Sequence, residues 1–363
     1  MYIVFILFFT LMYCFSALAM NQKNEFDSQF NLRVVKVGQL FLAISLVVYF
    51  VGMRNMNTYY GDTWGYINTY NNLRGFLSAR LDGELMYGNS EMFFWPFAYI
   101  IKFLGFNDRG WLIASSLLTS FLILISYRGI VGSKNYLFVL IGLYLSYYLV
   151  FSCAMRQSMA EAFVLLSFVS AIRKNVVQSM VFSFIAIGFH QSAIISLIFI
   201  FLVNVRVNAK FLVFFMLASV SITSLFSDLL FGSLSSLGIS SITTKVEIYN
   251  SGGYAGEYGN LLHHKQFIIL TLFTMIYLYL SKLEGYLCNY LIYIYLLIVL
   301  FWSSPVMSGR MMNYLTLVFP LIVWFSISYI IPEKYKYITY STFFSLLGYF
   351  VLSTESTQLV LGL

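Results

Sequence analysis

Four basic side chains stand at the edges of long apolar runs, where a charge is costly in lipid and marks either a functional site or a paired structural group. These are Arg54, Arg156, His190 and Arg310. The planar guanidinium of arginine suits phosphate oxygens, and an imidazole is a common general base. Together the four residue types indicate binding of a phosphate-bearing substrate, with proton transfer by His190. The alternatives are arginines that snorkel to the membrane interface and a histidine that ends a helix.

A second group of residues combines one carboxylate with aromatic rings. Asp62, Trp64, Tyr66 and Tyr70 follow Arg54 within one polar stretch. A sugar ring needs a flat face for stacking and an acceptor for its hydroxyl groups, and a carboxylate is such an acceptor. The group therefore predicts carbohydrate binding. The alternative is an aromatic belt at the membrane interface, in a chain that is 20% aromatic.

Metal and cofactor chemistry has no comparable pattern in the sequence. His263 and His264 are adjacent in a glycine-rich stretch and lack the spacing of a metal-binding pair on a helix. The three cysteines also lack metal-type spacing. We therefore expect no metal and no cofactor. The glycines beside the histidines predict either a lid or a plain flexible loop.

The composition places these residues in a membrane protein. Hydrophobic residues make up 60% of the chain and charged residues 10%, whereas an ordinary soluble domain has roughly 25% charged residues. Backbone groups in lipid must be paired, and the apolar runs lack the alternation of barrel strands, so transmembrane helices are the expected element. The 21 Lys and Arg residues, for a net charge of +7, are scattered singly between the apolar runs. That scatter indicates cytoplasmic loops instead of a nucleic-acid-binding tract.

A bilayer core of ~30 Å needs about 20 apolar residues per helix, and the sequence predicts about twelve such spans. Their approximate ranges are 1–20, 37–53, 110–127, 136–153, 158–172, 176–189, 193–205, 211–226, 266–281, 286–302, 312–331 and 338–353. A further apolar segment, Met92–Phe106, is short and contains Pro96 and Lys102, which predicts a re-entrant segment. The expected fold class is thus an all-α polytopic membrane protein. Without an internal repeat or linker, residues 1–363 are expected to form a single integral membrane domain.

The positive-inside rule orients these spans. The basic residues of the short loops fall on one side if Met92–Phe106 does not cross the membrane. They are Lys23, Arg33, Lys36, Arg128, Lys134, Arg173, Lys174, Arg206, Lys210, Lys282, Lys334 and Lys336. Both termini and two long polar loops, at about 54–91 and 227–265, then face outward. All four basic residues at the run edges lie on that outer face.

Read in order, these residues resemble the EpsG family of Wzy-like polysaccharide polymerases. The motifs that carry the resemblance are Arg54, Gly61-Asp62 with Tyr66, Arg156-Gln157 at a span junction, and Gly188-Phe-His190-x-Ser-Ala193. Their order and spacing match the family over most of the chain. One departure is the order Gly-Asp-Thr at residues 61–63, where Gly-Thr-Asp is common in the family.

The resemblance implies a glycosyltransferase with a GT-C-like helical fold in the bacterial inner membrane. Such an enzyme joins undecaprenyl-pyrophosphate-linked oligosaccharide repeat units at the outer face, without a metal, into an O-antigen, a capsule or an exopolysaccharide. The expected catalytic residues are His190, Arg156 and Arg310, and the expected substrate-binding residues are Arg54, Asp62, Trp64 and Tyr66. The expected partners are the lipid-linked oligosaccharides, membrane lipid, a chain-length regulator and a flippase, and no nucleic acid.

Two other classes of protein are weighed against this one. A lipid-linked oligosaccharide flippase or other transporter should show internal repeats and broken helices that meet near the bilayer midplane, whereas the basic residues here gather at one face. A membrane acyltransferase that uses His190 on a thioester donor needs a cytoplasmic site, and His190 is predicted outside. A plain membrane scaffold leaves the outward arginines unexplained.

Overall fold

The computed structural model describes residues 11, 14, 25–52, 54–56, 63–87, 91–133, 135–203, 205, 265–283, 285–301 and 305–352, which form helices and the turns between them. The helices are α2 (Glu25–Gly52), α3 (Thr63–Asn72), α4 (Ala79–Tyr87), α5 (Phe94–Phe103), α6 (Asp108–Val131), α7 (Tyr136–Cys153), α8 (Met155–Ile172), α9 (Val176–Phe189), η2 (Gln191–Ile195), α10 (Ser196–Leu202), α14 (Lys265–Leu280), α15 (Tyr286–Leu300), α16 (Pro305–Ile330) and α17 (Glu333–Leu352). The expected all-α character is therefore confirmed for the described ranges. The chain divides into two compact units, one of Met1–Ile200 with Ile327–Leu363 and one of Phe201–Ser326.

Among the described residues, two helices are long and apolar enough to cross a membrane, Asp108–Val131 and Met307–Ile330. Shorter apolar helices are Val35–Tyr49, Val176–Phe189, Gln191–Leu202, Phe267–Leu280 and Tyr286–Leu300. With 60% hydrophobic residues, these helices support a helical membrane protein. The count of twelve spans and the single membrane domain stay predictions. The predicted spans at 1–20 and 211–226 lie outside the described residues.

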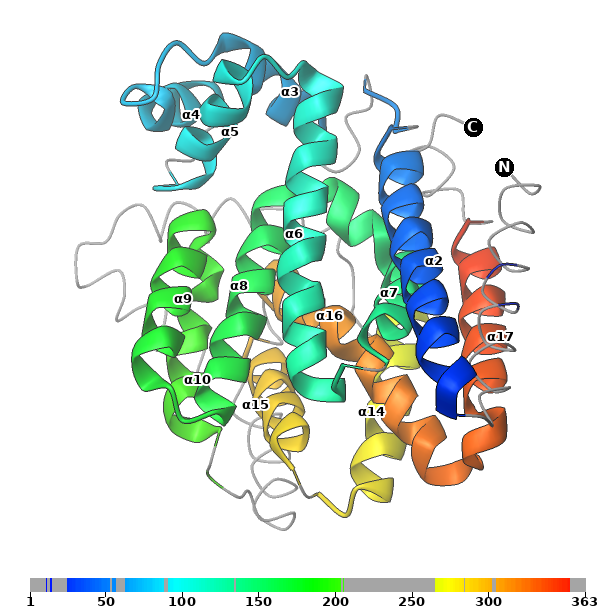
Figure 1. The fold of residues 1–363 in the computed structure, drawn as a ribbon. Helices are drawn as coiled ribbons and strands as arrows, with labels where there is room; N and C mark the ends of the chain where they lie inside the picture. The colour runs from blue at the N-terminus through cyan, green and yellow to red at the C-terminus, as the bar shows by residue number, and fades with distance from the viewer. Residues whose placement is uncertain are drawn as a thin grey trace. The chain divides into compact units, whose positions relative to one another are not determined.

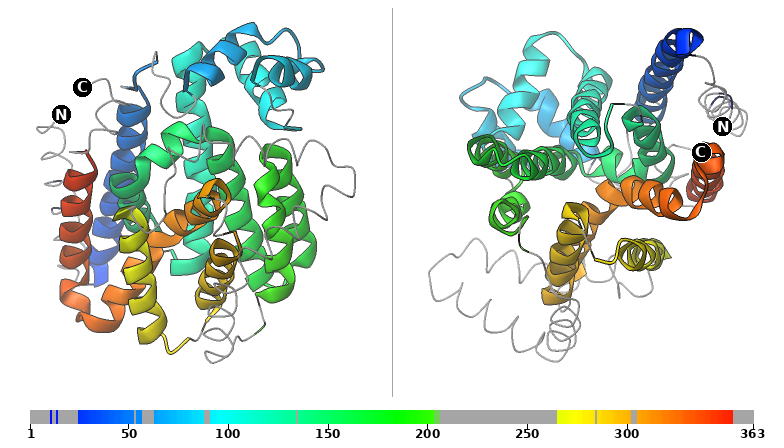
Figure 2. Two further views of the ribbon diagram at one scale, coloured as in Figure 1. Left: turned by 180° about the vertical axis from the view of Figure 1, so that it is seen from behind. Right: turned by 60° about the horizontal axis from the view of Figure 1, so that its bottom comes forward.

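Helix α8 is the most enclosed helix of the first unit and packs between α6 and α9 (Figures 1 and 2). Its Ser167 hydroxyl lies 2.9 Å from Ser179 Oγ and 2.8 Å from Ser183 Oγ of α9. Small hydroxyl side chains allow two helices to approach closely and to hydrogen-bond across a lipid-embedded contact. The chain reverses at Lys174, which has a positive φ of 59°, so α8 and α9 form an antiparallel hairpin.

The C-terminal ends of α6 and α8 lie side by side. A Cβ built on Gly129 of α6 would lie 2.6 Å from Val169 and 3.1 Å from Nη2 of Arg173 on α8. Arg128, next to Gly129, is therefore at the same end of the bundle as Arg173. This arrangement agrees with the positive-inside assignment of both loops to one side.

Helices α2 and α17 complete the first unit by packing against α7. The Tyr340 hydroxyl of α17 donates to the Val139 carbonyl of α7 at 3.0 Å. A Cβ on Gly142 would lie 2.3 Å from that hydroxyl oxygen, so Gly142 leaves the space that the tyrosine occupies. The Tyr337 hydroxyl donates to Asn135 Oδ1 at 2.8 Å one turn earlier.

Three short helices, α3, α4 and α5, gather at the N-terminal end of α6 (Figure 1); we call them the short-helix layer. They have 10, 9 and 10 residues, and at 1.5 Å per residue each spans about 15 Å, half of a bilayer core. The predicted loop at 54–91 thus contains two helices, and Met92–Phe106 contains a third. The residues on either side of α5 are hydrogen-bonded to other helices. The Phe93 N–H donates to the Gly188 carbonyl at the end of α9, and the Phe106 carbonyl accepts from the Tyr70 hydroxyl of α3. Whether α5 enters the lipid stays a prediction.

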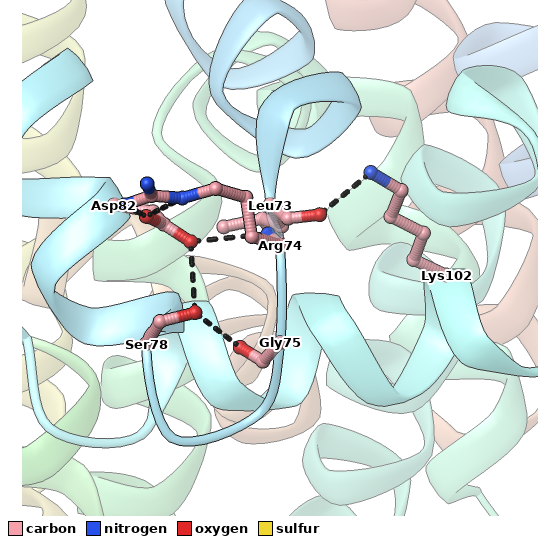
Figure 3. A network of polar contacts seen from close by, with 6 residues as sticks. All are labelled: Leu73, Arg74, Gly75, Ser78, Asp82 and Lys102. Carbon is pink, nitrogen blue, oxygen red and sulfur yellow. Dashed lines mark hydrogen bonds and ion pairs between the residues drawn. The ribbon is translucent and has the colours of Figure 1, made fainter.

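A polar network closes the turn between α3 and α4 and attaches α5 to it (Figure 3). The buried Asp82 carboxylate accepts from the Arg74 backbone N–H at 3.0 Å, from Arg74 Nε at 2.8 Å and from Ser78 Oγ at 3.2 Å, and it forms an ion pair with Arg74 Nη2. On the other side of the turn, Lys102 Nζ of α5 donates to the Leu73 carbonyl at 2.9 Å. These bonds satisfy backbone groups that the ends of short helices would leave without partners.

The short-helix layer rests on the first turn of α6 through stacked rings. Tyr70 and Trp111 are parallel, with 4.6 Å between ring centroids and 4° between ring planes. The Tyr70 hydroxyl donates to the Phe106 carbonyl at 2.7 Å. Burial and the nearby charge of Asp108 raise the pKa of Tyr70 to about 12, so this phenol keeps its proton and remains a donor.

In the second unit, α14, α15 and α16 are joined by side-chain contacts of the same kind. Asn289 Nδ2 of α15 donates to the Val203 carbonyl at 2.8 Å, and the Tyr290 hydroxyl donates to the Tyr314 carbonyl of α16 at 3.3 Å. Phe273 of α14 meets Phe319 of α16 edge to face. Asn289 therefore adds an amide hydrogen bond to an otherwise apolar contact.

Candidate functional site

Arg156 is the second residue of α8, and the residue is 7% exposed. The sequence predicts a span that begins at residue 158, whereas the helix begins at Met155, so Arg156 lies in the first helical turn. Its Nε donates to the Tyr66 hydroxyl of α3 at 3.2 Å, and its guanidinium lies 5.7 Å from the centre of the Tyr66 ring. A buried guanidinium at the N-terminal end of a helix, where peptide N–H groups also point outward, favours anions.

Glu91 forms a buried ion pair with Arg156, through Oε1 and Nη1. Glu91 is 7% exposed and stands in the turn before α5. The two residues are 65 positions apart, so no spacing in the sequence could predict the pair. The one available signal is that an acid at the edge of an apolar run needs a partner. Oε2 of Glu91 is buried and has no hydrogen-bond partner among the described residues.

Tyr66 connects this ion pair to a cluster of aromatic rings. Its ring centroid lies 5.7 Å from Phe94, 6.3 Å from Trp95 and 6.4 Å from Trp111. All four rings are buried. The cluster fixes the Tyr66 hydroxyl in place, because a ring packed on several sides loses its alternative rotamers. The Tyr66 hydroxyl, which the sequence assigns to sugar binding, here holds Arg156.

Arg54 reaches the same helix from the end of α2. It is 1% exposed and donates through Nη2 to the Thr63 hydroxyl, at the first residue of α3. Thr63 and Tyr66 are one turn apart on the buried face of α3. Helix α3 thus brings two of the predicted arginines, Arg54 and Arg156, to one face.

His190 lies between two helices, at the C-terminal end of α9 and the N-terminal end of η2. Its Nδ1 accepts the Ser192 backbone N–H at 3.1 Å and lies 2.9 Å from the Ser192 hydroxyl. A backbone N–H can only donate, so Nδ1 supplies a lone pair, and in the neutral ring the proton is on Nε2. His190 is thus a hydrogen-bonded histidine at a helix end, and its reading as a general base stays a prediction.

A backbone hydrogen bond ties His190 to the Arg156 cluster. The Phe93 N–H donates to the Gly188 carbonyl at 2.9 Å, and the Phe93 and Phe189 rings meet edge to face at 6.2 Å. Phe93 is two residues after Glu91, and Gly188 is two residues before His190. Arg156, at the start of α8, and His190, at the end of the antiparallel α9, therefore lie at the same end of the bundle, as the charge-derived topology predicts.

Of the remaining predicted residues, one is exposed on α3, one belongs to the second unit, and the others lie outside the described residues. Trp64 of α3 is 45% exposed. Arg310 is half-buried in α16, which places it in the second unit. Asp62 and the pair His263-His264 lie outside the described residues. Within the described ranges there is no group of three His, Cys, Asp or Glu side chains that could hold a metal ion.

The site of the first unit thus has one guanidinium paired with one carboxylate, a second buried guanidinium, a phenol and an imidazole donor. Buried arginines bind phosphate oxygens through paired N–H groups. The carboxylate can accept a proton, or a hydrogen bond from a hydroxyl group. The imidazole Nε2–H can stabilise a developing negative charge. This set suits transfer of a group from a phosphate leaving group to a hydroxyl acceptor.

Comparison with known proteins gives one match. The family model described as the EpsG family matches residues 38–359, nearly the whole chain. No curated protein and no solved structure matches the chain.

Proposed function

The chain belongs to the EpsG family, and from this premise we propose that it polymerises lipid-linked oligosaccharide repeat units into a surface polysaccharide. The donor and the acceptor are carried on undecaprenyl pyrophosphate at the outer face of the bacterial inner membrane. The family is associated with exopolysaccharide polymerisation of the Wzy type, a glycosyltransferase activity. The lipid-linked substrate, the multi-pass topology and the membrane face belong to the proposal.

The proposed reaction needs few catalytic groups from the protein, because a glycan on a lipid diphosphate is already activated. The diphosphate departs with the bonding electron pair, so the enzyme must bind and neutralise that charge and remove a proton from the incoming hydroxyl. Arg156 binds the diphosphate oxygens in this scheme. His190, expected from the sequence to be the base, is assigned instead as the Nε2–H donor to the departing oxygens. Arg310 is assigned to the diphosphate as well.

The glycan side of the site draws on the residues around α3. Arg54 and Tyr66 lie on its buried face, and Trp64 offers an exposed ring for stacking against a sugar. Asp62 is assigned to the sugar hydroxyls from its place in the sequence. Membrane lipid surrounds the helices, and a flippase and a chain-length regulator are proposed as protein partners.

The observation that carries this proposal is the buried Arg156 at the start of α8, tied through Glu91 and Phe93 to His190. Two groups suited to a diphosphate, a guanidinium and an imidazole donor, are held at one end of the bundle by bonds from the turn before α5 to α8 and α9. A membrane scaffold needs no such arrangement. The arrangement of Arg156 and His190 supports an enzyme that stabilises an anionic leaving group.

The test is the glycan profile of a strain in which the gene is deleted. Loss of a polymerase leaves single repeat units on the lipid carrier or on the final acceptor, and long polymer returns when the wild-type gene is supplied. Normal long polymer in the deletion strain would overturn the proposal. Repeat units that accumulate only at the cytoplasmic face, inaccessible to an added sugar oxidant outside the cell membrane, would identify a flippase instead.

A further inference from the structure

We propose that Glu91 is the catalytic base of this site and takes the proton from the acceptor hydroxyl. The inference rests on the proposed function, since it assigns a role within the same glycosyl transfer. It adds a residue that the sequence motifs leave out and reassigns the proton transfer that they suggest for His190.

His190 is unsuited to the role in the geometry observed. A general base needs a lone pair directed at the proton it removes. The lone pair of His190 on Nδ1 already accepts the Ser192 backbone N–H at 3.1 Å, which caps η2. The other ring nitrogen then carries the proton and is a donor.

Glu91 has the free acceptor that His190 lacks. Its Oε1 is engaged by Arg156, while its Oε2 is buried and has no partner within the described part of the chain. In the ion pair the carboxylate is ionised, and an ionised carboxylate oxygen only accepts. Leaving such an oxygen buried without a partner is unfavourable, because it loses its hydrogen bonds to water without replacement. A bound hydroxyl group would supply the missing hydrogen bond.

The position of Glu91 also brings the two substrates together. Glu91 Oε1 is bonded to Arg156, the residue assigned to the diphosphate of the donor glycan. An acceptor glycan that is bound to Oε2 therefore lies next to the donor glycan. Trp111, whose ring packs on Tyr66, has a fully buried Nε1–H that likewise has no partner among the described groups. Glu91 Oε2 can accept a hydrogen bond from a sugar hydroxyl and Trp111 Nε1 can donate one to a sugar hydroxyl, since a hydroxyl both donates and accepts.

The reaction balances without any further reagent. The oxygen of the acceptor hydroxyl forms a bond to the anomeric carbon of the donor glycan, and the bond from that carbon to the diphosphate oxygen breaks. The electron pair of the broken bond leaves with the lipid diphosphate, where Arg156 stabilises the charge. The hydroxyl proton moves to Oε2 of Glu91, which releases it to solvent after the product leaves.

The competing explanation is that Glu91 only positions Arg156. The two roles differ in what a glutamine would do at this position. Its amide oxygen can still accept from Arg156 Nη1, so positioning survives, but a neutral amide is no base at neutral pH. Loss of the negative charge beside Arg156 also leaves that guanidinium more available to a diphosphate.

The experiment uses the full-length protein in lipid nanodiscs, with lipid-linked repeat units extracted from the deletion strain as both donor and acceptor. We expect Glu91→Gln to lower kcat by ~10²- to 10⁴-fold, the contribution of a general base. Its binding of undecaprenyl pyrophosphate, measured separately, should be equal to or tighter than that of the wild type. Glu84→Gln, an exposed glutamate of α4 in the same layer, is the matched control and should behave as the wild type.

The outcomes separate the two proposals. If the wild type makes no polymer from these substrates, the proposed function fails. If the wild type is active and Glu91→Gln keeps a rate within a few-fold of it, Glu91 is not the base. If Glu91→Gln loses both the rate and the binding of undecaprenyl pyrophosphate, its role is to position Arg156, and the inference is overturned.

Discussion

The Phe93 backbone N–H donates a 2.9 Å hydrogen bond to the Gly188 carbonyl, which fastens the segment that carries Glu91 to the end of α9. The close approach depends on the absence of a side chain at position 188. A Cβ there would lie 2.1 Å from the Phe93 ring, closer than real contacts allow. The Phe189 ring, which meets the Phe93 ring edge to face, restricts the directions in which Phe93 can move aside.

Gly188→Ala is therefore expected to abolish long polymer by pushing Phe93 and Glu91 away from α9. Overpacking of this kind costs about 1–3 kcal/mol, so the protein should still reach the membrane. The measurements are the glycan ladder and a blot for protein level. Gly75→Ala is the control, since the nearest atom to its added Cβ would be 3.4 Å away. Restoration of polymer by adding Phe93→Ala to Gly188→Ala would confirm the steric cause, and a normal ladder from Gly188→Ala alone would contradict it.

The Asp82 network predicts that the short-helix layer loosens in acid. Burial raises the pKa of Asp82, but hydrogen bonds and charge from Arg74, with a further bond from Ser78, outweigh it and hold the pKa below its ordinary value. A carboxyl with a lowered pKa stabilises the folded state above its unfolded pKa of about 3.9 and loses that stabilisation as the pH falls through the lowered value. Protection of residues 74–87 against hydrogen exchange, taken relative to the intrinsic rate at each pH, should thus persist at neutral pH and fall only below about pH 4.

Asp82→Asn tests the assignment, because it removes the charge at every pH. Protection of residues 74–87, relative to the intrinsic rate, should already be low at neutral pH in this variant and should change little on acidification. The equivalent change at the exposed Glu84, to Gln, should leave the exchange as in the wild type. Equal protection in Asp82→Asn and wild type at neutral pH would show that the network does not hold the turn.

The apolar helices could be predicted from the sequence because a helix in lipid needs a long run of apolar residues, and such runs are visible in the sequence. Helices α7 and α9 coincide with the predicted ranges 136–153 and 176–189. Arg156 and Gln157 are polar, so the sequence predicts that they lie in a loop and that the span starts at 158. Helix α8 begins three residues earlier, at Met155. Both residues are helical and buried because a partner compensates each of them: Glu91 for the arginine and Glu161 for the amide.

The short-helix layer and Glu91 could not be predicted in the same way. Helices α3 and α4 are too polar and too short to produce an apolar run, and their stability comes from contacts such as Tyr70 on Trp111. The charge-derived topology placed Arg54, Arg156 and His190 at one end, which the structure of the first unit also does. The partner of Arg156 depends on a turn that brings residues 65 positions apart together, and no local pattern reports such a contact.

Arg156→Lys is expected to lose diphosphate binding nearly as fully as Arg156→Ala. Lysine keeps the charge, so Glu91 is not left as an uncompensated buried ion. Its single ammonium cannot reproduce the fork that meets Tyr66 and Glu91 together and binds phosphate through paired N–H groups. The loss of a charged hydrogen bond, about 1.5–3 kcal/mol, corresponds to roughly 10- to 100-fold in affinity.

The measurement for this pair is the binding of undecaprenyl pyrophosphate to each variant in nanodiscs. Arg80→Lys, at an exposed position of α4, is the control and should bind as the wild type. Tight binding by Arg156→Lys would mean that charge alone suffices, and the bidentate role of Arg156 would have to be abandoned.

His190 makes two separable contributions, a cap through Nδ1 and a donor at Nε2, and His190→Asn distinguishes them. The asparagine oxygen can accept the Ser192 N–H, so thermal stability should stay near that of the wild type, while His190→Ala should lose about 0.5–2 kcal/mol, as for other capping residues. Both variants lack an N–H at the position of Nε2 and should fail to make long polymer. The measurements are the glycan ladder and the unfolding temperature of the purified protein, with Gln191→Ala, at the next and exposed position, as the control. Long polymer from His190→Asn would show that the cap is the whole function of His190, and the departing diphosphate would then depend on the arginines alone.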